Sequence, residues 1–266
     1  MITRDELTRF LEDLYQYQTL KDFTENGLQV EGKSEIRHIA FGVSFNLPFL
    51  EKAIEANADA IIVHHGIFQQ GNFTLKNHLK PKIKKLLEHE ISLFGIHLPM
   101  DSHPDIGHNA LLMKSFHAEN PVPFDYGFIG ENIRGYSLER ILDQFHTQLH
   151  PEHYTPPPML SVPSYFRISS IHGFQVLLNG PETPKKIAII SGGSSFSYET
   201  AVAKGVDTFL GGDIKEHIPS ISYETHTNFV NLGHYFSEKP GVLALMEKIS
   251  SAFDVTTGYI EIPNPI

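Results

Sequence analysis

The chain of 266 residues is 41% hydrophobic and 20% charged, an ordinary globular composition that is long enough to bury a sizeable core. Its formal charge of −10 argues against general nucleic-acid binding and against binding to anionic membranes. The chain has no cysteine, which excludes disulfide bonds and thiolate zinc sites.

The N-terminal segment is expected to be an amphipathic helix, because Leu7, Phe10, Leu11 and Leu14 follow helical spacing. The segment lacks the apolar core of a signal peptide. No run in the chain approaches the roughly 18 apolar residues that a membrane helix needs. We therefore expect a cytoplasmic protein with no membrane partner.

Short apolar runs then alternate with amphipathic segments of helical length. The expected strands lie within residues 36–45, 58–65, 91–98, 185–193, 206–213, 228–235 and 256–262. The expected helices lie at residues 48–56, 75–90, 197–205 and 239–253. Continuous apolar strands that alternate with helices are typical of mainly parallel sheets covered on both faces, so we predict an α/β fold.

The middle of the chain differs in composition. Residues 121–184 are rich in proline and turn residues, and Pro156–Pro158 cannot lie inside a helix or a central strand. We expect one helix near Ser137–Leu149 and a hairpin strand near Gly173–Leu178. The predicted division is an N-terminal α/β lobe at residues 1–125, which C-terminal residues would complete, a connecting region at 126–184 and a C-terminal α/β lobe at 185–266.

The two predicted lobes are alike in outline. In each, a strand and a helix lead to an aspartate that precedes a second apolar strand. A later strand of each lobe ends in a His followed four residues on by a carboxylate, namely His97 with Asp101 and His234 with Glu238. Two similar βαβ-type lobes are therefore expected, and either an internal duplication or the common physics of such units would explain the likeness.

Metal-compatible side chains gather where the predicted strands end. His64 and His65 directly follow the apolar run Ala60–Val63, and burying two imidazoles costs desolvation unless something compensates it. The carboxyl ends of parallel strands share one edge of a sheet, where ligands collect. Adjacent side chains of an extended strand point to opposite sides, so the two rings would hold two ions, with Gly66 turning the backbone to bring both into one pocket.

Each His–carboxylate pair also has a structural alternative. Pro99 predicts a loop for residues 97–101, and Asp105 is the better cap for the following helix, which leaves Asp101 for metal ligation. His97 is interpreted as a ligand or as a hydrogen-bonding group that orients a carboxylate. Glu238 would alternatively favour the positive end of the next helix.

Imidazole and carboxylate ligands without sulfur suit Zn, Fe, Mn, Co or Ni. Three histidines and two carboxylates are too many for one catalytic ion that keeps an open position, and they fit two divalent ions with a bridging carboxylate. Such a pair of ions activates a shared water, which predicts hydrolysis of a small-molecule substrate.

Four motifs in order along the chain, "VHHGIF", "HLPMDSHPDIGHN", "GGDIKEH" and "NLGHYFSEKPGV", resemble the family of dinuclear-metal proteins related to the NGG1-interacting factor three. Its members are often labelled GTP cyclohydrolase 1 type 2-like. The resemblance implies a two-lobed α/β subunit, a ring-shaped homohexamer and a dinuclear site between the lobes. It implies as metal ligands His64, His65, Asp101, His234 and Glu238, with Glu238 as the bridge and His97 close to the metals.

The favoured hypothesis is therefore a metal-dependent hydrolase of a small molecule, with nucleotides among the candidate substrates and Glu238 and His97 as the catalytic residues. No segment reads as a dedicated guanine-binding element. The Gly/Ser turn at residues 191–197 could take a phosphate, or be an ordinary strand-to-helix turn. The alternatives are a non-catalytic metal-handling or regulatory module that binds a protein partner, and a protein whose histidines are only structural.

Overall fold

The computed structural model describes residues 1–68, 74–150 and 166–264. The chain divides into two compact units, the first formed by Met1–Ile106 with Gly241–Ile262 and the second by Gly107–Pro240 with Pro263 and Asn264. The C-terminal helix and strand thus belong to the N-terminal unit. These borders differ from those expected at residues 125 and 184, because the segment after Ile106 packs on the second unit.

In the first unit, a five-stranded sheet has the order β14-β4-β5-β6-β2, in which only β2 runs antiparallel to its neighbour. Its strands are β2 (Gly27–Val30), β4 (His38–Ser44), β5 (Ala60–His65), β6 (Ser92–Gly95) and β14 (Thr256–Tyr259). A short pair is formed by β1 (Ile2–Thr3) and β3 (Glu35–Ile36). The helices are α1 (Arg4–Tyr15), α2 (Leu47–Glu55), α3 (Leu79–Glu88), α4 (Leu98–Ser102) and α10 (Pro240–Ala252), with the 3₁₀ turn η1 (Tyr17–Thr19).

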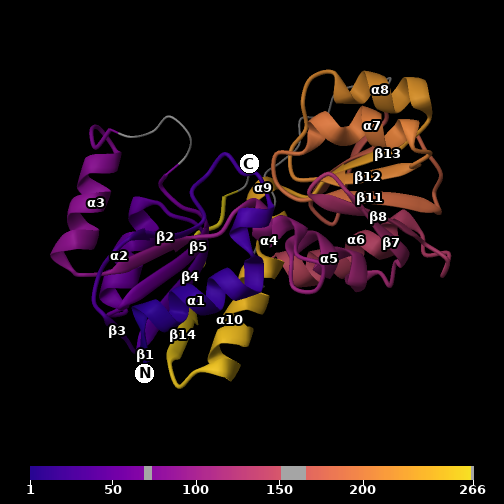
Figure 1. The fold of residues 1–266 in the computed structure, drawn as a ribbon. Helices are drawn as coiled ribbons and strands as arrows, with labels where there is room; N and C mark the ends of the chain where they lie inside the picture. Colours follow the sequence, from indigo (N-terminus) through magenta and orange to yellow (C-terminus); the bar gives the residue numbers. More distant parts are fainter. Residues whose placement is uncertain (69–73, 151–165, 265–266) are drawn as a thin grey trace. The chain divides into compact units, whose positions relative to one another are not determined.

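The core of the first unit follows from strand alternation. Ile61 and Val63 of β5 point to the face on which α2 and α3 pack, where they meet buried residues such as Leu50 and Leu86. Ile62, between them, is also fully buried, so the opposite face of the sheet is covered too. Figure 1 shows α1 and α10 beside the strands of this sheet. The prediction of continuous apolar strands covered on both faces is thus confirmed in this unit.

The second unit has a seven-stranded sheet among the described residues, with the order β7-β8-β11-β12-β13-β10-β9. Its strands are β7 (Glu119–Phe124), β8 (Gly127–Glu131), β9 (Ile168–Ile171), β10 (Phe174–Leu178), β11 (Lys186–Ile190), β12 (Thr208–Gly211) and β13 (Asn228–Asn231). Its helices are α5 (His108–Ser115), α6 (Leu138–Leu149), α7 (Tyr198–Ala203), α8 (Ile218–Thr225) and α9 (His234–Ser237), with the 3₁₀ turn η2 (Ser195–Ser197). The helix expected near Ser137–Leu149 and the strand expected near Gly173–Leu178 are both present.

The expectation of a mainly parallel sheet is wrong for the second unit. Only β11, β12 and β13 pair in parallel, and an antiparallel hairpin extends the sheet on each side. Pro121 and Pro123 lie in the edge strand β7, where a missing N–H is tolerated. The turn of the other hairpin contains His172 and Gly173, both with positive φ, as a two-residue hairpin turn requires. The triple proline at 156–158 lies outside the described residues.

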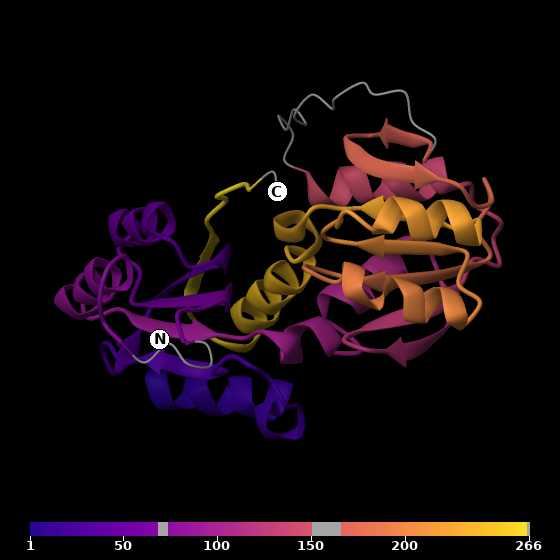
Figure 2. The ribbon, with the colours of Figure 1, turned by 90° about the horizontal axis from the view of Figure 1, so that it is seen from above.

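Helices cover both faces of this second sheet. Figures 1 and 2 show α7 and α8 on one side of the strands and α5 and α6 on the other. On the α7 side, the rings of Tyr198, Phe209 and Phe229 pack with centroids 5.0–5.6 Å apart. Such aromatic contacts contribute about 0.5–1.5 kcal/mol each beyond the burial of their area.

In both units, an aspartate before the central strand accepts hydrogen bonds from the backbone of the neighbouring strand. Asp59 precedes β5 and its carboxylate accepts hydrogen bonds from the backbone N–H groups of Arg37 and His38. Asp207 precedes β12 and accepts in the same way from Lys185 and Lys186. A βαβαβ segment with the same aspartate tie therefore occurs in both units, which agrees with the likeness seen in the sequence.

Within residues 1–68, 74–150 and 166–264, none of the helices combines the length and the hydropathy that spanning a bilayer requires.

The tie at Asp59 predicts a pH-dependent contribution to stability. Partial burial acts to raise the pKa of Asp59, but the N–H groups of Arg37 and His38 and the ammonium of Lys33 outweigh it and lower the pKa. A group with a depressed folded-state pKa stabilises the fold above its unfolded-state pKa, and this contribution is lost as the pH falls through the folded-state value. Asp59→Asn should therefore lower the free energy of unfolding at pH 7 by about 1–3 kcal/mol.

The difference between wild type and Asp59→Asn should shrink as the pH falls below about 4, because the carboxylate then takes up a proton in the unfolded chain while the folded chain still resists it. Urea unfolding across that pH range measures it. Asp13→Asn is the matched control, since Asp13 is exposed on α1. A difference that is constant with pH would contradict the prediction.

Candidate metal centre

Three histidines of the first unit are each held by a hydrogen bond at Nδ1. His64 and His65 end β5, and His97 follows β6. The Nδ1–H of His64 donates to the carbonyl oxygen of Ile96 at 2.9 Å, and Nδ1 of His65 lies 3.0 Å from the hydroxyl of Ser44. The Nδ1–H of His97 donates to the Asp22 carboxylate at 3.0 Å. These contacts leave Nε2 of each ring as the nitrogen that can face a ligand.

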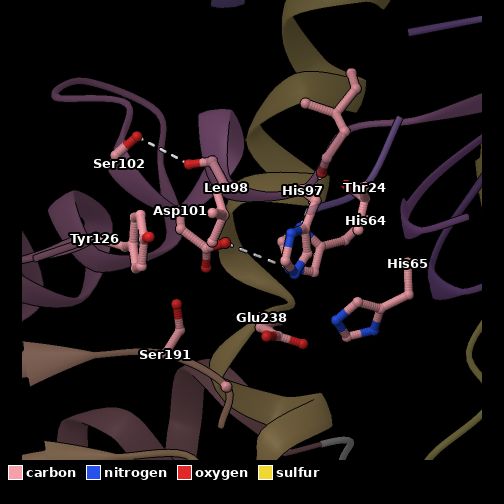
Figure 3. A network of polar contacts seen from close by, with 12 residues as sticks. Thr24, His64, His65, His97, Leu98, Asp101, Ser102, Tyr126, Ser191 and Glu238 are labelled. Atoms are coloured by element: carbon pink, nitrogen blue, oxygen red, sulfur yellow. Dashed lines mark hydrogen bonds and ion pairs between the residues drawn. The ribbon is translucent and has the colours of Figure 1, made fainter. Parts of the chain in front are cut away.

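The three rings converge. A ring nitrogen of each of His64, His65 and His97 lies within 4.8 Å of those of the others, and the closest ring centroids, those of His64 and His65, are 4.5 Å apart. Figure 3 shows these rings gathered near the ends of their strands. His64 is 1% exposed and His97 is 9% exposed. Three imidazoles in this arrangement could hold a divalent ion of the first transition row.

The role expected for Gly66 is wrong. Its φ does not lie in the positive region, so glycine is not needed there to turn the backbone. A Cβ at Gly66 would instead lie 2.2 Å from Oε1 of Gln29, whose oxygen accepts the N–H of Ile67. The glycine therefore lets the strand end pass close to Gln29, and the rings of His64 and His65 converge without a turn between them.

Asp22 is a site residue that the sequence did not reveal. Its buried carboxylate accepts from Nδ1 of His97, from the N–H of Leu98 and from the side chain of Asn26. Burial acts to raise the pKa of Asp22, but the hydrogen bonds from His97 and Asn26 outweigh it and hold the pKa well below its ordinary value. A carboxylate on Nδ1 orients the imidazole and makes Nε2 more basic, as in carboxylate–histidine–metal arrangements.

Asp101 lies in a helix where the sequence predicted a loop. Pro99 stands in the first turn of α4, where no intrahelical partner is lost by its missing N–H. The helix places Oδ2 of Asp101 3.6 Å from Nε2 of His64, the contact drawn as a dashed line in Figure 3. Asp101 is 5% exposed, so the first unit brings a buried carboxylate to its histidines.

The second unit contributes a His–carboxylate pair of its own. His234 begins α9 after β13, and Glu238 follows the last residue of that helix. Nε2 of His234 lies 3.2 Å from Oε1 of Glu238, which is 3% exposed. The first unit thus brings together four of the expected site residues, namely His64, His65, His97 and Asp101. The second unit brings together the other two, His234 and Glu238.

These observations define an α/β protein with imidazole and carboxylate groups, most of them buried, that could hold divalent metal ions. The family model Duf34/NIF3 (NGG1p interacting factor 3) matches residues 2–265, and the chain belongs to this family. The resemblance drawn from the four sequence motifs is therefore confirmed.

The relatives cover nearly the whole chain. A GTP cyclohydrolase 1 type 2 homolog of Pyrococcus horikoshii is 34% identical, and one of Escherichia coli K12 is 31% identical, each with 98% of both chains covered. Among solved structures, the protein ybgI, described as of unknown function, is similar with a TM-score of 0.84 and 27% identity, and 100% of both chains covered. TTHA1606 from Thermus thermophilus is similar with a TM-score of 0.83, 25% identity and the same coverage.

Asp22→Asn should weaken the binding of Zn²⁺ about tenfold, because His97 would no longer hold the adjacent ring of His64, whose centroid lies 5.0 Å away. The amide cannot supply the charge that orients the Nδ1–H of His97, so the ring loses its fixed position. Isothermal titration of metal-free protein measures the affinity. Glu25→Gln, an exposed change in the same segment, should leave it unchanged, and equal affinities for the two variants would contradict the prediction.

Proposed function

We propose that this chain is a dinuclear metal-dependent hydrolase of a small molecule. Its two ions would be held by His64, His65, Asp101, His234 and Glu238, and would be chosen from Zn, Fe, Mn, Co and Ni. The observation that carries the proposal is the convergence of three imidazoles, each oriented at Nδ1. Imidazoles whose second nitrogen is fixed in this way are typical of metal and catalytic sites.

The joint use of both units is part of the proposal. The chain passes between the units after Ile106 and again at Pro240. Asp101 stands a few residues before the first passage and Glu238 stands just before the second. The family to which the chain belongs is the ground on which a common site is proposed for the two sets of residues.

Bound divalent ions would activate water and stabilise negative charge that develops on the substrate. The residues of the chain would do the rest. Glu238 would help to hold the ions, and its carboxylate would accept a proton from the attacking water. His97, with Nδ1–H held by Asp22, would deliver a proton from Nε2 to the leaving group.

The geometry of the described residues does not select one class of substrate. The names of the relatives make GTP the first compound to test. One water would open its imidazole ring to a formamide, and a second water would hydrolyse the formamide and release formate. The formal charge of −10 disfavours anions in general, but bound cations would reverse the sign of the field locally. Amides and other phosphoesters suit the same chemistry.

Metal stoichiometry tests the shared site. Metal-free wild type should take up two Zn²⁺ or Mn²⁺ ions per chain, measured by elemental analysis after dialysis. His64→Ala and Glu238→Ala should each lower the affinity for both ions, because a bridging group and its neighbours act together. If each variant lost one ion and bound the other as wild type does, the two units would carry independent sites, and the dinuclear proposal would be wrong.

Turnover tests the hydrolase. Metal-loaded wild type should release formate from GTP or hydrolyse a member of an amide and phosphoester panel, and a chelator should stop the reaction until metal is restored. Glu238→Ala should lose the activity. A metal-loaded protein that converts none of these compounds would exclude the proposed chemistry and leave metal handling or partner binding as the function.

A ring-shaped homohexamer in the cytoplasm stays a prediction, and light scattering of the purified protein tests the assembly.

A further inference from the structure

The loop after β11 approaches the His–carboxylate pair of the second unit closely. A Cβ at Gly192 would lie 2.1 Å from Oε1 of Glu238 and 3.3 Å from Nε2 of His234. The metal-compatible atoms of both side chains therefore face a backbone position that carries no side chain. A glycine that only packs against a helix would not need a carboxylate oxygen and an imidazole nitrogen beside its Cα.

The loop cannot withdraw from the pair, because it is held from several sides. The N–H of Gly192 donates to the hydroxyl of Ser237 at 3.0 Å, and its carbonyl accepts the N–H of Gly212 at 2.9 Å. A Cβ on Gly212 would lie 2.5 Å from that carbonyl oxygen, so the backbone behind the loop is also closely packed.

A half-buried aspartate fixes the next part of the same loop. The carboxylate of Asp213 accepts from the N–H of Ser195 at 2.8 Å and from its hydroxyl at 2.9 Å. The hydroxyl of Ser194 donates to the carbonyl of Ile190 at 2.6 Å. The loop is thus tied to the ends of β11 and β12 and to α9, which makes its position rigid relative to Glu238.

We infer that Gly192 is a positioning residue for the metal site, and that the missing side chain keeps open the space in which Glu238 and His234 face a cation. This inference rests on the proposed function for its metal, but the contact between Gly192 and Glu238 can be tested without metal. A methyl group at position 192 would push the carboxylate, the mobile end of a side chain, because the loop itself is held.

Gly192→Ala needs a control for backbone strain, since Gly192 has a φ of +64°. Gly135 has the same φ of +64°, lies in the same unit, and would have nothing within 4 Å of an added Cβ. Gly135→Ala therefore carries the same backbone cost without a side-chain contact.

The first experiment is thermal unfolding of metal-free protein for both alanine variants, in wild type and in a Glu238→Asp background. Gly192→Ala should lower the melting temperature more than Gly135→Ala does in wild type. The excess should disappear in the Glu238→Asp background, because the shorter side chain draws the carboxylate away from position 192. If Gly192→Ala alone fails to fold, recovery of folding by Glu238→Asp supports the inference equally.

The second experiment is titration with Zn²⁺. Gly192→Ala should bind roughly ten- to hundredfold more weakly than Gly135→Ala, as expected for a residue that positions a ligand. Equal affinities, or an excess loss of stability that persists with Glu238→Asp, would overturn the inference. If wild type bound no metal, the proposed function would fail, while the unfolding comparison would still decide whether Gly192 positions Glu238.

Discussion

The site depends on the register of three neighbouring parallel strands. Because β4, β5 and β6 pair side by side, Ser44 lies opposite His65, and the chain beyond Gly95 brings the carbonyl of Ile96 to His64. At the end of β5, His65 is therefore held from the side of β4, and His64 is held from the side of β6. A slip of either pairing would remove the hydroxyl or the carbonyl that fixes a ring, so the sheet itself is the support of the metal-compatible cluster.

Much of this arrangement could be predicted from the sequence, because its signals are local. The apolar run before His64 and the alternation with helices predicted β5, its position in an α/β sheet and the gathering of histidines at one edge. The carboxylate of Asp22 could not be predicted, since it reaches His97 from a turn-rich segment 75 residues away in the chain. The prediction of a loop at residues 97–101 was wrong because Pro99 lies in the first turn of α4, where proline is accepted. The β7–β8 hairpin was missed because an edge strand tolerates the prolines that suggested a connecting region.

The two units use one scaffold for different chemistry. Asp213 stands at the same sequence distance after Asp207 as His65 does after Asp59, at the end of the equivalent strand. The imidazole of the first unit belongs to the histidine cluster, whereas the carboxylate of Asp213 ties down the loop that carries Gly192. The second unit thus provides its metal-compatible groups from α9 and the residue that follows it, and uses the strand end for support.

The fixed Nδ1 contacts also bear on how an ion would come and go. The ring orientations are set by a carbonyl, a hydroxyl and a carboxylate of the fold. Departure of an ion from the proposed site would therefore leave the imidazoles in place, unlike small zinc domains that unfold without metal. Little ordering entropy is lost when an ion returns. In the proposed site, exchange between divalent ions would then be governed by supply and by intrinsic affinity for nitrogen and oxygen donors, and the growth medium would help to determine which element binds.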